Sequence, residues 1–258
     1  MRVSDHGSGD VGAHLEDFTV EHYRQLLQLA GDSYDFSSYR QIPLGDRFVL
    51  WRHDCDVSLN RAVRLAEIEH AEGVQATYFV NLHSEFYNPL EKDQSRLIHQ
   101  VLELGHELGL HFDHSYFGIS NWSTLEEQAN YEKEVLQRFF GTELSAVSFH
   151  NPQAVLAVID QETCAGLVNC YSRTFRDQVP YVSDSNGYWR FRRLKDVLVA
   201  AEDMCLQVLT HPVWWQDGPL SPWAKINRSV DGRLASTLSG YEGALKSDGR
   251  TNVGKEFD

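Results

Sequence analysis

The feature that most constrains the fold of this chain is a set of short apolar runs, each of which ends in Asp, His or both. Five such runs occupy residues 49–56, 108–113, 147–150, 182–184 and 206–212. Strands that are apolar on both faces, with polar residues only at the C-terminal end, are typical of a parallel sheet or barrel covered by helices. In such barrels the active site gathers at that end of the strands. The sequence therefore predicts carboxylates and imidazoles that converge at one face, as in a metal site with an acid/base pair.

Strands and helices alternate along the chain. Apolar residues at helical spacing predict helices after Thr19, over residues 59–71 and 97–104, and from a capping box at Ser123 to near Phe140. Strands are predicted at residues 47–53, 76–80, 107–110, 146–149, 167–171, 189–191 and 205–209. This alternation implies right-handed βαβ units and a parallel sheet. We expect one α/β domain over residues 15–240, between a flexible N-terminus (1–14) and a polar C-terminal tail (241–258).

The overall composition limits the partners and the compartment. The 258 residues carry a formal net charge of −14, which disfavours nucleic acid and anionic membranes and favours a neutral or positively charged substrate. The sequence has no run of transmembrane length, and its N-terminus lacks the apolar core of a signal peptide. The four cysteines have neither CxxC spacing nor the density of a disulfide scaffold. These features predict a cytoplasmic protein, and no pattern fixes its oligomeric state.

The strongest single element is the pair Asp54 and Asp56, in the sequence His-Asp-Cys-Asp. Two carboxylates two residues apart on an extended chain share a face, so one can bind a metal while the other hydrogen-bonds a reacting water. Cys55 is then directed to the opposite face, which argues against its being a nucleophile. The alternative is an exposed loop in which Asp56 or Ser58 caps the next helix.

Three histidines lie within residues 106–114. His111 ends a predicted strand, where a neutral imidazole can complete a zinc site with Asp56. His114 is a second candidate ligand from this segment, although three residues further on the chain can already face solvent. His106 lies at the opposite end of the strand, which favours a role in a turn or at a helix end.

His150 and His83 also follow predicted strands. His150 ends the strand at 146–149, and both a ligand role and a structural role stay open for it. His83 follows the strand at 76–80 on the same barrel face. Contact with substrate, support of its own loop and metal binding all stay open for His83.

The last apolar run ends at His211, on a strand that lies beside the first strand in a closed barrel. An imidazole placed across the metal from a carboxylate base can protonate a leaving amine. Packing against Trp214 and Trp215 is the alternative, and Trp214 is also a candidate for supporting the substrate. Asp184 and Trp189 can orient the imidazole and wall the pocket, although an Asx-turn explains the same segment without chemistry. The sequence contains neither a Gly-x-Ser-x-Gly elbow nor a glycine-rich phosphate loop.

Taken in order, these motifs resemble the polysaccharide deacetylase superfamily, the NodB-homology or carbohydrate esterase family 4-like group. More narrowly, they are similar to a divergent intracellular branch whose first motif reads His-Asp-x-Asp. The resemblance covers roughly residues 18–216 and rests on residues 52–56, 76–79, 83–88, 105–113, 148–152, 184–190 and 211–215. It implies a distorted (β/α)7 barrel, a divalent metal (usually zinc) held by one Asp and two His, and hydrolysis of an N-acyl group, most often acetyl, from an amino sugar.

The resemblance also implies roles for individual residues. Carried over by position, Asp54 is the general base and Asp56 the metal aspartate. His111 matches the first metal histidine, and His211 matches the histidine that acts as the acid. The expected partner is a small-molecule or glycan substrate that bears an N-acyl group, and the expected cofactor is a zinc ion.

Two positions depart from the family pattern. Ser115 stands where the second motif has its second histidine, which leaves His150 or His114 as the third ligand, and we prefer His150 because it ends the neighbouring strand. Asn151 stands where members of the branch often carry an arginine that can hold the base carboxylate. Two alternatives therefore stay open: a sugar N-deformylase or other C–N hydrolase that uses the same site, and a catalytically silent barrel that binds a glycan or a partner.

Overall fold

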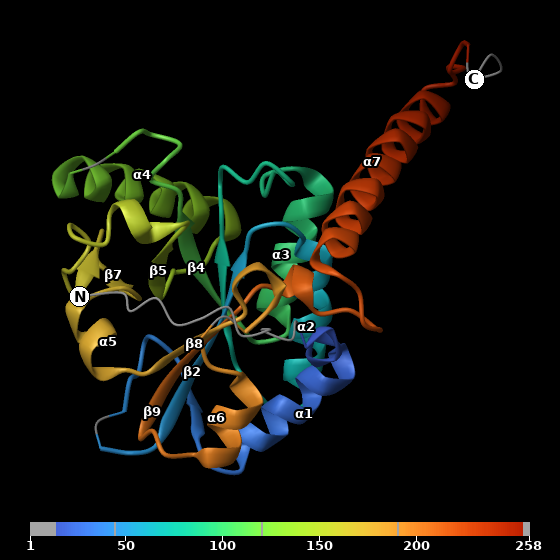
Figure 1. The fold of residues 1–258 in the computed structure, drawn as a ribbon. Helices are drawn as coiled ribbons and strands as arrows, with labels where there is room; N and C mark the ends of the chain where they lie inside the picture. The colour runs from blue at the N-terminus through green and yellow to red at the C-terminus, as the bar shows by residue number, and fades with distance from the viewer. Residues whose placement is uncertain (1–13, 44, 120, 190, 255–258) are drawn as a thin grey trace.

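One curled, mostly parallel sheet organises the chain (Figure 1). The computed structural model describes residues 14–43, 45–119, 121–189 and 191–254. The nine strands of the sheet follow the order β6-β7-β5-β4-β3-β2-β9-β8, with β1 paired to β2. Their bounds are β1 Asp35–Ser37, β2 Phe48–Cys55, β3 Thr77–Val80, β4 Glu107–Phe112, β5 Ala146–Phe149, β6 Thr163–Cys164, β7 Leu167–Asn169, β8 Tyr181–Ser183 and β9 Cys205–Thr210.

Seven of these strands form a continuous parallel array from β7 to β8, while β6 pairs antiparallel with β7. This array confirms the predicted α/β fold and fits the distorted (β/α)7 barrel that the motif resemblance implies. The described strands at the two ends of the sheet do not pair with one another. Side chains of β9 and β2 instead reach across the barrel to the segment after β7: Nε2 of Gln207 lies 3.4 Å from the backbone oxygen of Cys170, and Arg52 donates to Tyr171.

Seven α-helices accompany the strands, namely α1 Val20–Gly31, α2 Leu59–Ala71, α3 Lys92–Glu103, α4 Trp122–Phe140, α5 Arg173–Gln178, α6 Leu194–Ala200 and α7 Pro222–Ser247, among the described residues. Thr19 caps α1 as predicted, because its side chain accepts a hydrogen bond from the backbone of His22. The predicted capping box at Ser123 is wrong. The N-cap of α4 is Asn121, whose side chain accepts from the backbone of Thr124 at 3.0 Å, so the helix begins earlier.

Alternation along β2 separates the chemistry of the site from the supporting core. Arg52 and Asp54 point into the barrel, where Leu50 on the same face packs among buried residues that include Phe79. His53 points outward, and its ring contacts Glu69 of α2 at 2.5 Å. Cys55 also faces outward into the apolar core, as predicted, and burial raises the pKa of its thiol well above the usual range.

The strand predicted at residues 189–191 is wrong, because neither Trp189 nor Phe191 is in a strand and position 190 lies outside the described residues. The strand that completes the array is β8, which pairs parallel with β9. The chain leaves β8 through a short turn in which Asn186 and Gly187 both have positive φ, of 59° and 78°. This turn directs Trp189 away from the sheet.

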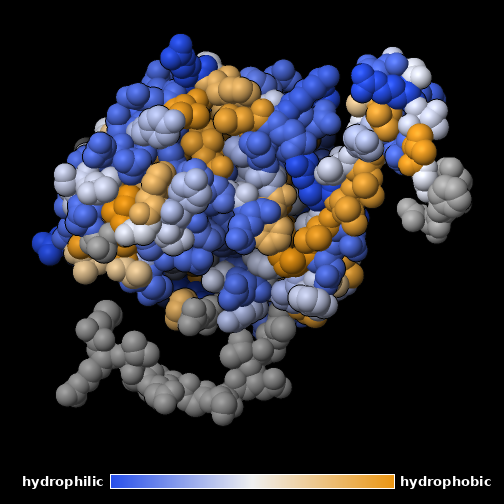
Figure 2. All heavy atoms as spheres, turned by 90° about the horizontal axis from the view of Figure 1, so that it is seen from above, coloured by the Kyte–Doolittle hydropathy of each residue, from blue (hydrophilic) through white to orange (hydrophobic). Residues whose placement is uncertain are grey.

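The C-terminal region differs most from the prediction. A 26-residue helix, α7, begins after the N-cap Ser221 and projects from the body of the domain (Figure 1). The predicted boundary at residue 240 falls inside this helix, and the predicted N-terminal segment 1–14 lies outside the described residues except for residue 14. Apolar side chains run along the projecting helix (Figure 2), including Leu234 at 58% exposure and Tyr241 at 57%. Within the described residues, no helix combines the length and apolarity that a membrane span requires.

Candidate metal centre and acid/base site

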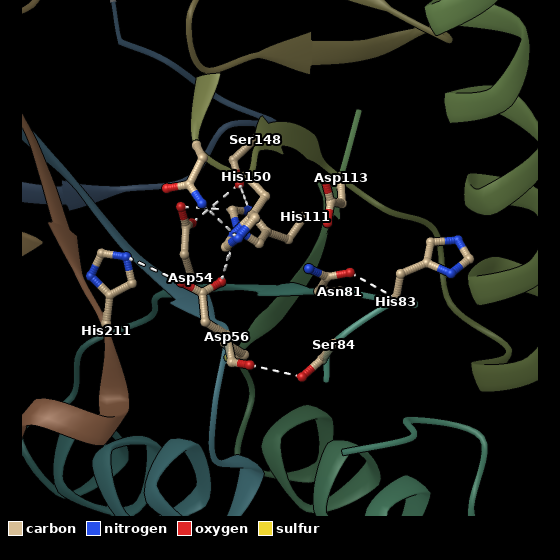
Figure 3. Close-up of polar contacts among 12 residues, drawn as sticks. Asp54, Asp56, Asn81, His83, Ser84, His111, Asp113, Ser148, His150 and His211 are labelled. Carbon is tan, nitrogen blue, oxygen red and sulfur yellow. Dashed lines mark hydrogen bonds and ion pairs between the residues drawn. The ribbon is translucent and has the colours of Figure 1, made fainter. Parts of the chain in front are cut away.

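Asp54 and Asp56 occupy the C-terminal end of β2, as the sequence predicts. Asp54 is buried inside the barrel, where Oγ of Ser148 donates to its Oδ1 at 3.2 Å and Nη2 of Arg52 lies 3.4 Å from its Oδ2. Asp56 follows the strand, and its backbone oxygen accepts a hydrogen bond of 2.8 Å from Oγ of Ser84 (Figure 3). The carboxylate of Asp54 and the backbone of Asp56 are therefore held by neighbouring strands and loops.

Three side chains converge on one point beside β2. Asp56, His111 and His150 each offer a ligand atom within 4.8 Å of the other two. Nε2 of His111 lies 2.9 Å from Oδ1 of Asp56, and Nδ1 of His150 lies 3.4 Å from the same oxygen (Figure 3). The two imidazole nitrogens are 3.2 Å apart. The three groups come from the ends of β2, β4 and β5, which is the convergence that the sequence predicts.

The donor set of this cluster fits a divalent cation. Oδ1 of Asp56 is buried and has no hydrogen-bond partner among the described residues, although two imidazole nitrogens face it at short range. An acceptor oxygen and two ring nitrogens that converge in this way are arranged as ligands of a common ion. One carboxylate and two imidazoles are a donor set typical of catalytic zinc. Burial would raise the pKa of Asp56, but His111, His150 and the more distant His211 bring it well below the usual range, so this ligand is ionised.

The far ring nitrogens of both imidazoles have partners of their own. Nδ1 of His111 lies 2.6 Å from Oγ of Ser148, which fixes the ring and directs Nε2 to the cluster. Nδ2 of Asn151 lies 2.9 Å from Nε2 of His150. If Nδ1 of His150 bound a cation, the neutral ring would carry its proton on Nε2. The Asn151 side chain would then accept a hydrogen bond from Nε2 through its amide oxygen in place of its nitrogen. Asn151 thus supports His150 rather than the base carboxylate.

His211 ends β9 on the other side of Asp56, with Nε2 at 3.6 Å from Oδ2 of that residue. Its Nδ1 lies 2.6 Å from Oδ1 of Asp184, and its backbone N–H also donates to that carboxylate. The indole of Trp215 donates to Oδ2 of Asp184 at 3.2 Å. Burial would lower the pKa of His211, but Asp184 above all raises it to about 9. The imidazole is therefore a cation at neutral pH and carries a proton on Nε2.

His83 does not join the cluster. Its Nε2 lies 2.8 Å from Oε1 of Glu132 in α4, its ring stacks on Tyr116 at 3.5 Å, and it points away from Asp56 (Figure 3). Burial lowers the pKa of His83 and raises that of Glu132 to about 8. Of the three roles left open for His83, these contacts agree with support of its own loop.

His114 and His106 also lie outside the cluster. Nε2 of His114 is 3.4 Å from the backbone oxygen of Asn151, so this ring lies against the loop after β5. His106 is buried and bridges backbone groups: Nε2 lies 2.9 Å from the oxygen of Ala66, and Nδ1 accepts from the N–H of Ala76. The structural role predicted for His106 matches these contacts.

The two tryptophans expected near His211 occupy different places. The indole of Trp189 donates to Asp17 at 3.0 Å and stacks on Phe18, whereas the indole that donates to Asp184 is that of Trp215. Trp189 packs against Trp215, and its role in the pocket wall stays a prediction. Trp214 is buried and packs closely on Gly187. A Cβ added at position 187 would lie 3.1 Å from the indole ring of Trp214. Its contribution to a substrate pocket stays a prediction.

Arg52 is a residue of the candidate site that the sequence analysis did not single out. Its guanidinium is fully buried, 3.4 Å from Asp54, and donates to the hydroxyl of Tyr171 at 3.0 Å. It therefore places a cation beside the Asp54 carboxylate, whereas Asn151 contacts His150. The signal was available, because residues two apart on a strand share a face.

The chain matches no family model and no curated protein. Solved structures similar to it include the peptidoglycan deacetylase PdaC from Bacillus subtilis, at a TM-score of 0.45 and 12% identity over 80% of this chain and 99% of that chain. A family 4 acetyl xylan esterase from Clostridium thermocellum, in complex with a cobalt ion, gives 0.42 and 16% over 79% and 92%. The catalytic domain of a peptidoglycan N-acetylglucosamine deacetylase from Eubacterium rectale gives 0.42 and 15% over 78% and 90%.

Two of these proteins are peptidoglycan deacetylases and one is a family 4 esterase. At these identities and TM-scores, the interpretation of the site rests on its own geometry. That geometry offers three groups that could hold a metal ion, a buried carboxylate next to them, and an imidazole on the opposite side.

Proposed function

We propose that the protein is a zinc-dependent hydrolase that removes an N-acyl group, acetyl in the first instance, from an amino-sugar-containing substrate. The observation that supports this most is the unpartnered Oδ1 of Asp56, faced by His111 and His150. Asp54 and His211 flank this point from different strands. A carboxylate base and an imidazolium acid on either side of a cation are the groups that amide hydrolysis requires.

Asp56, His111 and His150 would hold the ion. When bound, a divalent cation polarises the amide carbonyl, stabilises its developing negative charge and lowers the pKa of a water molecule. Ser148 and Asn151 orient the two imidazoles through their far nitrogens, which keeps the ligand atoms directed at one point before the ion arrives.

Asp54 acts as the general base. Its Oδ2 is 3.6 Å from Nδ1 of His111, so the carboxylate lies directly beside a ligand ring. Arg52 and Ser148 hold its two oxygens in place. As a carboxylate, Asp54 takes a proton from the attacking water as the new C–O bond forms.

His211 acts as the general acid. It carries a proton at neutral pH because Asp184 raises its pKa to about 9, and its Nε2 faces the cluster. The amide nitrogen leaves as the C–N bond breaks, and the proton from Nε2 converts it to an amine. Asp54 then releases its proton to solvent, and His211 takes up a proton from solvent, so both residues return to their starting states. The products are a carboxylic acid, which ionises at neutral pH, and the free amino sugar.

The test combines turnover with metal content. We expect purified protein to hold about one zinc per chain and to release acetate from N-acetylated amino sugars. Asp54→Asn should lower turnover at least about 100-fold while zinc content stays unchanged, because Asp54 is not a ligand. Full turnover in Asp54→Asn would overturn the base assignment.

The same assay separates the alternatives. Parallel reactions with formyl, acetyl and longer acyl amides distinguish a deacetylase from a deformylase. Protein that contains no metal and releases no acid would support the silent, glycan-binding barrel. All four cysteines are free, which agrees with the cytoplasmic location that we propose.

A further inference from the structure

A polar cavity of about 320 Å³ lies beside the segment that follows Asp56 of the candidate metal centre. Its walls come from residues 57–61, which lead from β2 into α2, from the segment after β3 that includes Phe86 and Tyr87, and from α7. Val57 follows Asp56 directly, and Ser84 binds the backbone of Asp56 (Figure 3). Two residues of extended chain span at most about 7 Å, so the cavity wall at Val57 lies within the length of a small molecule from Asp56.

Two guanidinium groups line the cavity without forming an ion pair in the described part of the chain. Arg61 donates to the backbone oxygen of Trp215, and its buried Nε has no hydrogen-bond partner. Arg228 donates to the neutral amide oxygen of Gln216 at 3.2 Å. A third guanidinium at the rim, that of Arg233, is neutralised by Glu91.

The charges at this cavity repel one another. Burial lowers the pKa of Arg61, the carboxylate of Asp217 opposes that shift, and the cations of Arg228 and Arg64 lower it further. Two cations near one another are unfavourable, and an anion that binds between them removes this cost. The chain as a whole has a net charge of −14, so this local excess of positive charge is unlike the remainder of the protein.

Further donors face the same space. Gln94, at 7% exposure, lines the cavity, and its side chain makes no hydrogen bond with the described residues. Leu59 and Asn60 open the 13-residue helix α2 at the cavity wall, and the first amides of a helix lack intrahelical acceptors. Two guanidinium groups, a buried amide and free backbone N–H groups face this space, and no carboxylate is among the described residues that line it, which is the chemistry of a phosphate site.

We propose that this cavity binds the phosphate or pyrophosphate group of the substrate, so that the enzyme acts on a phosphorylated amino sugar. The inference rests on the proposed function for the acyl end of that substrate. It differs from the expectation of a neutral or cationic substrate, because the charge of the residues that line the cavity differs in sign from the net charge of the chain. The site uses arginines in place of the glycine-rich loop that the sequence lacks.

Binding of the anion alone tests the site without any turnover. In calorimetric titration of the full chain with inorganic pyrophosphate, Arg228→Gln should weaken binding at least about tenfold. Ser236→Glu, which adds a carboxylate to the cavity wall, should do the same without removing any contact of the fold. The matched controls are Ser239→Glu on the exposed surface of α7 and Arg40→Gln, which lies outside the cavity lining and pairs with Glu107, and both should bind as the wild type does.

Pyrophosphate can also bind a metal ion, and His111→Ala separates the two sources. Binding at the cavity should persist in His111→Ala, whereas binding at the cation should disappear with the ligand. Loss of pyrophosphate binding in His111→Ala, or unchanged binding in both Arg228→Gln and Ser236→Glu, would overturn the proposal.

Kinetics then connect the cavity to the reaction. N-acetylglucosamine 1-phosphate should have a KM at least about tenfold below that of N-acetylglucosamine, and Arg228→Gln should remove this difference in KM. Equal KM values together with no pyrophosphate binding would end the phosphate proposal and leave the hydrolase intact. Pyrophosphate binding without hydrolysis of either sugar would end the proposed function and leave the anion site intact.

Discussion

Asp184 holds His211 by two different groups at once: Oδ1 lies 2.6 Å from the ring Nδ1, and the backbone N–H of His211 donates to the same carboxylate at 3.0 Å. The first contact fixes the tautomer, since the proton on Nδ1 faces Asp184 and Nε2 faces Asp56. The second fixes the position of the residue at the end of β9. An acid that must deliver its proton to one leaving nitrogen requires both restraints.

Asp184→Asn should therefore lower kcat about 100-fold. His211 must be protonated to act as the acid, so turnover falls as pH rises through its pKa of about 9. Without the carboxylate the pKa of His211 falls, and the basic limb of the kcat–pH profile should move to lower pH. Asp196→Asn, on the exposed face of α6, is the control and should leave the profile unchanged. A basic limb that stays in place would remove His211 from the role of acid.

The choice between the two candidate third ligands can be measured directly. His150 lies in the cluster, whereas His114 lies against the backbone of Asn151. Supporting residues of metal sites typically change affinity 10- to 100-fold, so His150→Ala, which removes a ligand, should weaken zinc binding by more than about 100-fold. His114→Ala should change it little. Competition with a chromogenic chelator provides the measurement, and the reverse ranking would assign the ligand to His114.

The parts of the fold that follow from local pattern were predictable. Helix α2 and strand β5 have the predicted bounds, because helical spacing and an uninterrupted apolar run identify them without tertiary information. The approach of Asp56 to His111 was predictable for a topological reason, since parallel strands place their C-terminal ends at one face. The same reasoning extends to Arg52, which shares the inward face of β2 with Asp54 and could have been found by counting two residues back.

The errors arise where distant contacts decide. Trp189 and Phe191 look like a strand in the sequence, but the indole of Trp189 binds Asp17, 172 residues away, and no local pattern predicts that partner. Helix α7 was missed because Gly232, Gly240 and Gly243 interrupt its apolar positions and lower its helix propensity. Its apolar stripe also faces solvent along much of its length, so the usual link between apolar periodicity and a buried face is absent.

Arg52 provides a test of the interior of the barrel. It is fully buried, and Asp54 is the carboxylate that faces it. Removing one partner of a buried pair leaves the other charge uncompensated, at a cost of about 3–5 kcal/mol. Arg52→Gln should therefore lower the free energy of unfolding in urea by about that amount, and Arg52→Lys should recover part of it. Arg40→Gln, which breaks an exposed pair with Glu107, should cost about 1 kcal/mol or less. A similar cost for both variants would show that the buried pair contributes little.

Glu132 should make stability depend on pH in the direction opposite to most carboxylates. Burial raises its pKa from 4.5 to about 8 in the folded protein, so the folded state binds a proton that the unfolded state releases above 4.5. Stability is then lost as pH rises from about 4.5 to 8.

Glu132→Gln keeps a hydrogen bond to His83 and removes the titration. Its free energy of unfolding relative to the wild type should therefore increase between pH 5 and pH 9, by roughly 2 kcal/mol or more. Glu134→Gln, exposed on the same helix, is the control, and urea titrations at the two pH values provide the comparison. A difference between Glu132→Gln and the wild type that is the same at both pH values would mean that Glu132 is ionised throughout, paired with a charged His83.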